Sequence, residues 1–221
     1  MSSIILFNKP YGVLSQFRAD DANEHQTLSA FFTDKSLRVA GRLDATSEGL
    51  LLLTADGQIN KVITQPKQNK LGMNTNALGK TYLVQVEGQA TDDQLYHLSK
   101  GVMLKDGLTL PATAKRLSKD TLPMRLWDRY PPIRQRQNVP TSWLMLTIYE
   151  GKNRQIRRMT AQVGLPCLRL IRWSVAGFEL GELAVGQFVR VHMNAKRLAQ
   201  LGLSPVMAYC HGHDGLANNP P

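Results

Sequence analysis

The sequence predicts an α+β fold in which a mixed, mainly antiparallel sheet is flanked by helices. Segments with strand character outnumber helical ones, and they do not alternate as the regular strand–helix–strand units of a parallel sheet. The chain has 221 residues, 43% of them hydrophobic and 20% charged. This length and composition fit one large globular domain or two small ones.

The N-terminal third contains short strands separated by loops. Gly, Pro, Asn and Asp mark the turns, and runs of aliphatic residues mark the strands. The pattern predicts strands at 4–7, 13–17, 37–40 and 50–53, with helices at 28–32 and 58–64. Residues 66–79 are rich in Asn, Gln, Lys and Gly. We expect them to form a flexible connection within a domain spanning 1–195, between possible subdomains 1–65 and 80–195.

The remaining residues continue the mixed pattern. Residues 80–86 alternate as a strand does, and Thr91 to Gln94 form a capping box that opens a helix. Asn153 is expected to cap a helix over 154–163. The other predictions are a hairpin at 103–116, a long polar loop at 117–142, strands at 143–149, 168–173 and 188–191, and a disordered tail at 204–221.

Positive charge is concentrated in one fifth of the chain. The formal net charge is +10, and residues 115–158 hold eleven basic and three acidic residues, a net charge of +8. Such clustering is typical of proteins that bind nucleic acid. A solubilising surface explains the charge alone equally well.

Several classes of protein are not supported by the sequence. No apolar run is long enough to span a membrane, and no secretion signal precedes the first strand. Cys167 and Cys210 suit a reducing compartment, so we expect a cytoplasmic protein. Residues 210–214, Cys-His-Gly-His-Asp, are more readily an incidental cluster than a metal site. The zinc-deaminase, Walker and dinucleotide motifs are missing, and we expect no cofactor and no metal.

Asp44 is the candidate reactive carboxylate. It lies on a loop between two apolar strands, where a rigid sheet can hold a reactive group in place. A simpler explanation is that Asp44 and Ser47 only satisfy backbone groups in a turn.

Three segments resemble the motifs of the bacterial ribosomal RNA pseudouridine synthases. They run from Gly41 to Thr54, from Lys80 to Val84 and from Glu150 to Met159, in the family's order and spacing. The likeness covers about residues 4–191 and is to the small-subunit synthase A type. Within it, the sequence is most similar to the 23S synthases of the E type, which lack an N-terminal S4 module. Thr46 departs from the family pattern, where Asp or Asn is frequent, at a position that is not catalytic.

The resemblance implies the pseudouridine synthase catalytic fold and a role for four side chains. Asp44 would be the nucleophile, with attack on the ribose or on the base left open. Arg157 would be its ion-pair partner, and Tyr82 would stack on the flipped base and assist proton transfer at C5. Leu170 would form an aliphatic wall of the pocket.

The resemblance also implies a ribosomal RNA partner, most closely 23S RNA. The target uridine must leave its stack, and backbone contacts must offset that cost. Arg42, Arg154, Arg158 and the arginines of the 125–136 loop are candidates for phosphate contacts, although each could equally form a solvated face. We expect a monomer with no membrane partner, and no RNA-binding module before the strand at Ile4.

Three other functions remain open. A non-catalytic RNA-binding protein on the same fold would use Asp44 structurally. A synthase of the same class could act on 16S or transfer RNA. A metal-dependent nuclease would need a cluster of carboxylates that the sequence does not present.

Overall fold

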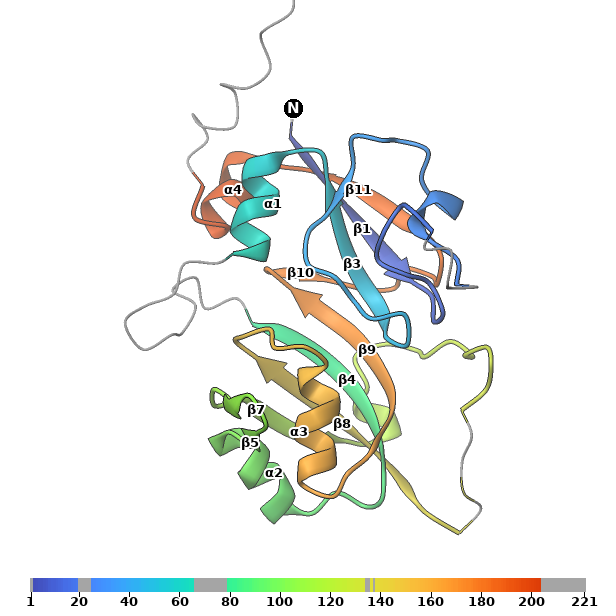
Figure 1. The fold of residues 1–221 in the computed structure, drawn as a ribbon, viewed down its shortest axis with the longest axis vertical. Helices are drawn as coiled ribbons and strands as arrows, with labels where there is room; N and C mark the ends of the chain where they lie inside the picture. The colour runs from blue at the N-terminus through green and yellow to red at the C-terminus, as the bar shows by residue number, and fades with distance from the viewer. Residues whose placement is uncertain (1, 20–24, 66–78, 134–135, 137, 204–221) are drawn as a thin grey trace, which may run out of the picture.

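Nine strands form one continuous sheet that runs through both halves of the molecule (Figure 1). The computed structural model describes residues 2–19, 25–65, 79–133, 136 and 138–203. The strand order is β11-β1-β3-β9-β4-β8-β7, with β10 beside β9 and β2 beside β3. All pairings are antiparallel except that of β3 with β9, so the predicted mixed, mainly antiparallel sheet is confirmed.

The strands are β1 (Ser3–Lys9), β2 (Arg38–Val39), β3 (Glu48–Thr54), β4 (Lys80–Glu87), β5 (Met103–Leu104), β6 (Gly107–Leu108), β7 (Thr113–Leu117), β8 (Thr141–Ile148), β9 (Cys167–Val175), β10 (Phe178–Glu179) and β11 (Phe188–His192). The helices are α1 (Gly57–Thr64), α2 (Asp92–Lys100), α3 (Gln155–Gln162) and α4 (Ala195–Gln200), with 3₁₀ turns at Leu28–Ala30 and Lys119–Thr121. β5 and β6 form a separate hairpin.

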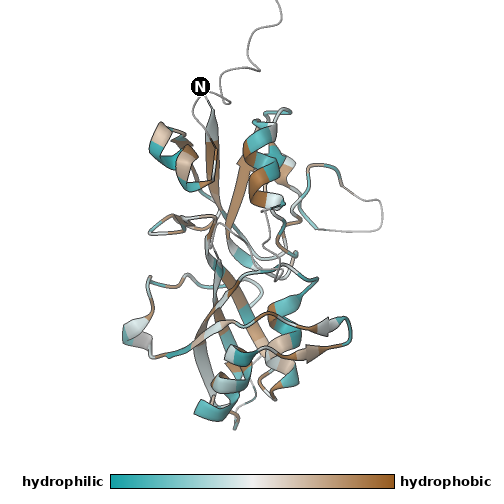
Figure 2. Cartoon of the chain, turned by 90° about the vertical axis from the view of Figure 1, so that its left-hand side faces the viewer, coloured by the Kyte–Doolittle hydropathy of each residue, from teal (hydrophilic) through white to brown (hydrophobic). Residues whose placement is uncertain are grey.

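The helices cover opposite faces of the sheet in the two halves. Ile59 of α1 and Leu198 of α4 belong to one buried cluster, whereas Leu98 of α2 and Met159 of α3 belong to the other. β4 contributes to both, because successive side chains of a strand point to opposite faces. In Figure 2 the inner strands are largely hydrophobic, and the helices carry both hydrophilic and hydrophobic residues. Two cores therefore stabilise one sheet, one on each face.

The parallel contact between β3 and β9 joins the two halves. Glu48 and Gly49 lie opposite Ile171 and Arg172 in this pairing. A Cβ atom at position 49 would lie 2.5 Å from the Arg172 carbonyl oxygen, and Gly49 has a φ of +96°. Only glycine tolerates both conditions without strain. The loop that carries Asp44 (residues 40–47, the Asp44 loop) leads into β3, whose second residue is Gly49. The close approach of β3 and β9 therefore requires glycine at position 49.

A buried ion pair reinforces this junction. The Arg169 Nε and Nη2 atoms donate to Glu48 Oε2 and Oε1, each at 2.9 Å, and both side chains are buried. The Trp127 indole also donates to Glu48 Oε1, at 2.9 Å, and the Arg169 Nη2 atom donates to the Trp127 carbonyl at 3.0 Å. These contacts attach the long segment between β7 and β8 to the sheet.

Some local predictions were wrong. Residues 13–17 do not form a strand, because the backbone of Val13 makes only an isolated bridge to Gln26. Arg154, not Asn153, is the N-cap of α3, with a φ of +45° and no side-chain cap. The 103–116 hairpin is shorter than predicted, since Thr113–Leu117 leaves it and pairs with β8. The expected flexible segment 66–79, apart from Gly79, and the expected tail 204–221 lie outside the described residues.

The end of β1 holds a fully buried lysine. Lys9 Nζ donates to the carbonyls of Pro10 and Val13 at 2.8 and 2.7 Å, which closes the turn after the strand. The pKa of Lys9 is lowered to about 7, chiefly by burial; the Glu48 charge opposes this shift, the Arg172 charge contributes to it, and the Asp44 charge opposes it. In the native state Lys9 therefore loses its proton near pH 7, whereas in the unfolded chain it keeps the proton up to the ordinary pKa of lysine.

This difference predicts a pH-dependent stability. Between pH 7 and about 10 the unfolded state binds the extra proton, so the free energy of unfolding should rise with pH, by at most about 1.4 kcal/mol per unit. In Lys9→Met this contribution should be lost, so the wild-type advantage over the variant should grow from pH 7 to pH 9 in urea denaturation. Lys35→Met, at an exposed position, is the control. Parallel pH profiles for wild type and Lys9→Met would contradict the assignment.

Candidate active site

The loop between β2 and β3 carries Asp44, and its backbone is held along its whole length. Each of the six carbonyl groups from residue 41 to residue 46 accepts a hydrogen bond. The Arg172 side chain donates to carbonyls 41 and 42 at 3.0 and 3.4 Å, and the Ser15 hydroxyl donates to carbonyl 43 at 2.7 Å. Carbonyls 44, 45 and 46 accept from the Ser47 amide at 3.0 Å, the Gly12 amide at 2.8 Å and the Arg157 side chain at 2.8 Å. Apart from Ser47, these donors come from segments remote in sequence. The position of Asp44 is therefore decided by the tertiary structure.

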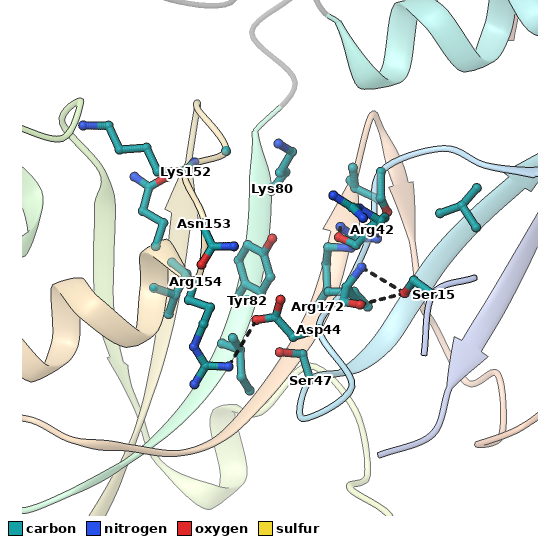
Figure 3. Close-up of a pocket in the computed structure, with 18 of the residues that line it drawn as sticks. Ser15, Arg42, Asp44, Ser47, Lys80, Tyr82, Lys152, Asn153, Arg154 and Arg172 are labelled. Carbon is teal, nitrogen blue, oxygen red and sulfur yellow. Dashed lines mark hydrogen bonds and ion pairs between the residues drawn. The ribbon is translucent and has the colours of Figure 1, made fainter. Parts of the chain in front are cut away.

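Asp44 opens into a pocket of about 870 Å³ between the two halves of the molecule. Its nearest charged partner is Arg154, whose Nη1 atom lies 3.8 Å from Asp44 Oδ2 (Figure 3). The Arg154 side chain is 48% exposed and the Asp44 side chain is 39% exposed, so solvent and a ligand can reach both. The left-handed backbone of Arg154 at the start of α3 brings its side chain to this position.

The ion pair expected between Arg157 and Asp44 is not formed in this structure. Arg157 lies within α3 and donates from Nη2 to the carbonyl of Thr46 and from Nη1 to the carbonyl of Cys167, at 2.8 and 3.3 Å. The Nε atom of Arg157 and the hydroxyl of Thr46 are buried without a hydrogen-bond partner. Arg157 therefore binds the backbone of the Asp44 loop, and Arg154 is the arginine that pairs with the Asp44 carboxylate.

Tyr82 and Leu170 both line the pocket. Tyr82, on β4, is 8% exposed, and its ring lies beside Asp44 in Figure 3. Leu170 is 5% exposed on the adjacent strand β9. The phenol and the aliphatic side chain supply largely apolar surface to the pocket that holds the carboxylate, which suits an aromatic base.

The pocket carries a strong excess of positive charge. Among the described residues that line it, Asp44 is the only acid, whereas five side chains are basic: Arg42, Lys80, Lys152, Arg154 and Arg172. Burial lowers the pKa of Lys80, as does the charge of Arg172, and Glu150 opposes the shift. An anionic ligand would relieve the repulsion among these cations.

Arg158 lies outside the pocket lining. Its Nη1 and Nη2 atoms donate to the two carboxylate oxygens of Asp106, at 2.6 and 3.0 Å. This bidentate pair connects α3 to the turn between β5 and β6. Arg154, by contrast, precedes the helix and lines the pocket.

Sequence reasoning missed Arg172, Lys80 and Ser15 as parts of the site. Arg172 is 1% exposed, and its Nε atom donates to the Leu50 carbonyl at 2.7 Å. The signal for it was present, because an arginine stands in an apolar strand on the same face as Leu170. A charged side chain on a buried face requires several hydrogen-bond partners, and the sequence does not show which.

The described residues lack two further features. No group of three or more His, Cys, Asp or Glu side chains among them is placed to hold a metal ion. Likewise, none of their helices is long and apolar enough to cross a membrane. The Cys210–Asp214 cluster lies outside the described part of the chain.

Comparison with known proteins assigns the fold and the family. Residues 3–162 match the family described as RNA pseudouridylate synthase. The chain is 46% identical over 190 residues to ribosomal large subunit pseudouridine synthase E of Vibrio parahaemolyticus, which covers 86% of this chain and 74% of the relative. It is 47% identical over 185 residues to the protein of the same name from Xanthomonas campestris pv. campestris, covering 84% and 93% of the two chains.

A solved structure agrees with the family match. The crystal structure of a pseudouridylate synthase superposes with a TM-score of 0.68 at 26% sequence identity, covering 91% of this chain and 74% of the other. The predicted catalytic fold is therefore confirmed. By sequence and by fold, the chain belongs to the RNA pseudouridylate synthase family.

Proposed function

We propose that this protein isomerises a specific uridine of 23S ribosomal RNA to pseudouridine, with Asp44 as the nucleophile. The observation that carries the proposal is that Asp44 is the only carboxylate among the described residues that line the pocket, whose other side chains are cationic, neutral polar, aromatic or aliphatic. The large-subunit synthases E of two bacteria share nearly half of their aligned residues with this chain. The names of these relatives refer to the large ribosomal subunit, which supports 23S RNA as the substrate.

The reaction needs each of these features. The bond between ribose C1′ and uracil N1 breaks, the base turns, and C1′ then bonds to C5. The C5 hydrogen leaves as a proton and N1 gains one, so atoms and electrons balance without a cofactor. A nucleophilic carboxylate divides this into two easier steps through a covalent intermediate. Asp44 is the group that the pocket offers for this task.

The other pocket residues have roles that follow from their positions. Tyr82 and Leu170 provide the surface on which the flipped uracil would lie, and the Tyr82 hydroxyl is available for proton transfer. Arg154 would stabilise the Asp44 carboxylate before attack, since its guanidinium is the nearest cation. Arg42, Lys80 and Lys152 line the rest of the pocket, where phosphates that flank the target would bind.

The cationic pocket also bears on how the target is selected. Phosphate contacts position an RNA but carry no sequence information. Selectivity should therefore come from RNA shape and from bases displayed in loops. We place the protein in the cytoplasm, acting as a monomer on protein-free or partly assembled 23S RNA.

Replacing the nucleophile gives the first test. Asp44→Asn preserves size but removes the attacking oxygen anion, so turnover should fall by about 10⁴-fold or more. RNA affinity should stay the same or increase, because the change removes the one negative charge from a cationic pocket. The assay is tritium release from ribosomal RNA labelled at uridine C5, with affinity measured by filter binding.

The matched control is Asp106→Asn, which removes an acid that lies outside the pocket lining. It should retain near wild-type turnover. Turnover by Asp44→Asn within about tenfold of wild type would assign the nucleophile elsewhere. RNA binding by the wild-type protein without tritium release from any ribosomal RNA would favour the non-catalytic alternative.

The arginines at the start of α3 give a second test. Arg154 faces the pocket, whereas the guanidinium of Arg158 is occupied by Asp106. Arg154→Ala should therefore reduce the slope of log K against log salt by about 0.7, the value for one phosphate contact in a single strand, and Arg158→Ala should change it less. Affinity measured between 50 and 300 mM salt checks this. A slope for Arg154→Ala equal to that of wild type would show that the pocket-facing side chain makes no phosphate contact.

The substrate is tested in cells. Deleting the gene should remove one pseudouridine from 23S RNA, as mapped by carbodiimide labelling and primer extension, and re-expression should restore it. The Asp44→Asn gene should not restore it. Loss confined to 16S or transfer RNA would change the substrate and keep the enzyme class.

A further inference from the structure

We infer that Arg172 is a positioning residue that holds the Asp44 loop and Tyr82 in one fixed relative arrangement. This inference rests on the proposed function of the pocket. It assigns to a buried side chain a task that its burial alone does not explain.

The environment of Arg172 is unusual for a buried charge. The side chain is 1% exposed, and no carboxylate of the described residues lies within 4.0 Å of its guanidinium. Burying a cation without a paired anion is expensive, and an apolar residue of similar volume would ordinarily be more favourable. The guanidinium must therefore contribute something that an apolar side chain cannot.

Its hydrogen bonds show what it contributes. Nη2 and Nη1 donate to the carbonyls of Gly41 and Arg42, at the start of the Asp44 loop, and Nε donates to the carbonyl of Leu50, beyond its end. One rigid planar group thus spans the loop from its start to the strand that follows it. No other donor to these loop carbonyls reaches both sides of Asp44 in this way.

The same guanidinium also adjoins Tyr82. Tyr82 and Arg172 are direct register partners on β4 and β9, and both side chains line the pocket. Burial lowers the pKa of Arg172, and the neighbouring Tyr82 side chain opposes this shift. Arg172 therefore binds the loop that carries the proposed nucleophile and is the cross-strand neighbour of the residue on which the base would lie.

Arg169, on the same strand β9, is an arginine with a structural role and serves as the comparison for Arg172. It is also buried, at 6% exposure, but it faces the opposite side of the sheet, pairs with the Glu48 carboxylate and is not part of the pocket lining. Replacing either arginine by lysine keeps the charge and removes the fork. The two variants thus form a matched pair that differs in which face of the sheet is disturbed.

The experiment compares Arg172→Lys with Arg169→Lys. A misplacement of about 1 Å in a catalytic group costs roughly 100-fold in rate, so Arg172→Lys should lower kcat by about that factor while KM and the RNA dissociation constant change less than about threefold. Arg169→Lys should lower the melting temperature comparably and leave kcat within about threefold of wild type. Hydrogen exchange should show faster exchange of the amides of residues 41–46 in Arg172→Lys alone.

A double-mutant cycle tests the contact with the ring. Tyr82→Phe should lower kcat with RNA affinity unchanged, and its effect should be smaller in the Arg172→Lys background, because the hydroxyl and its partner act together. Strictly additive effects would overturn the link to Tyr82. Equal kcat losses in Arg172→Lys and Arg169→Lys would overturn the positioning role altogether.

Tyr82→Phe alone keeps the inference testable if Arg172→Lys does not fold. It leaves the buried charge in place, and a kcat within threefold of wild type would overturn the part of the inference that concerns the hydroxyl. An inactive wild-type protein would instead count against the proposed function, so the two failures are distinguishable.

Discussion

The site depends on the immobilisation of one loop. Six successive carbonyls, from Gly41 to Thr46, accept hydrogen bonds, and five of these bonds come from the turn after β1, from α3 and from β9. Loops usually have mobile backbones, and a reactive group needs to be held within a fraction of an ångström. This loop meets that need because its backbone polar groups are satisfied by the surrounding fold, so Asp44 does not rely on its own turn for its position.

The sheet makes this arrangement possible because it is continuous. β3 and β9 are parallel and meet at Gly49 and Arg172, so the end of the Asp44 loop lies against the centre of the other half. Arg169 and Arg172 then project to opposite faces of β9. One binds the Glu48 carboxylate and stabilises the junction, and the other binds the loop carbonyls. A single strand thus supplies both the stability of the junction and the geometry of the pocket.

Electrostatics explains why such a pocket suits RNA. Among the described residues that line the pocket there are five basic side chains and one carboxylate. The lowered pKa values of Lys9 and Lys80 both reflect burial together with repulsion from Arg172. The pocket therefore holds more positive charge than its own acid can balance. A polyanion that brings phosphates to the rim would supply the missing negative charge, and it would present its base to the apolar wall formed by Tyr82 and Leu170.

The sequence by itself determined the fold class, the family motifs and the candidate nucleophile. Alternation in β4 and the capping box of α2 are local patterns, and the structure shows both. It could not show which arginine lies beside Asp44. Arg154 and Arg157 are three residues apart, and only the left-handed backbone at Arg154 decides that it enters the pocket while Arg157 binds the backbone of the Asp44 loop. The role of Arg172 also could not be predicted. Its hydrogen-bond partners are backbone carbonyls more than 120 residues away, and every residue type has a backbone carbonyl, so the sequence does not indicate which ones it binds.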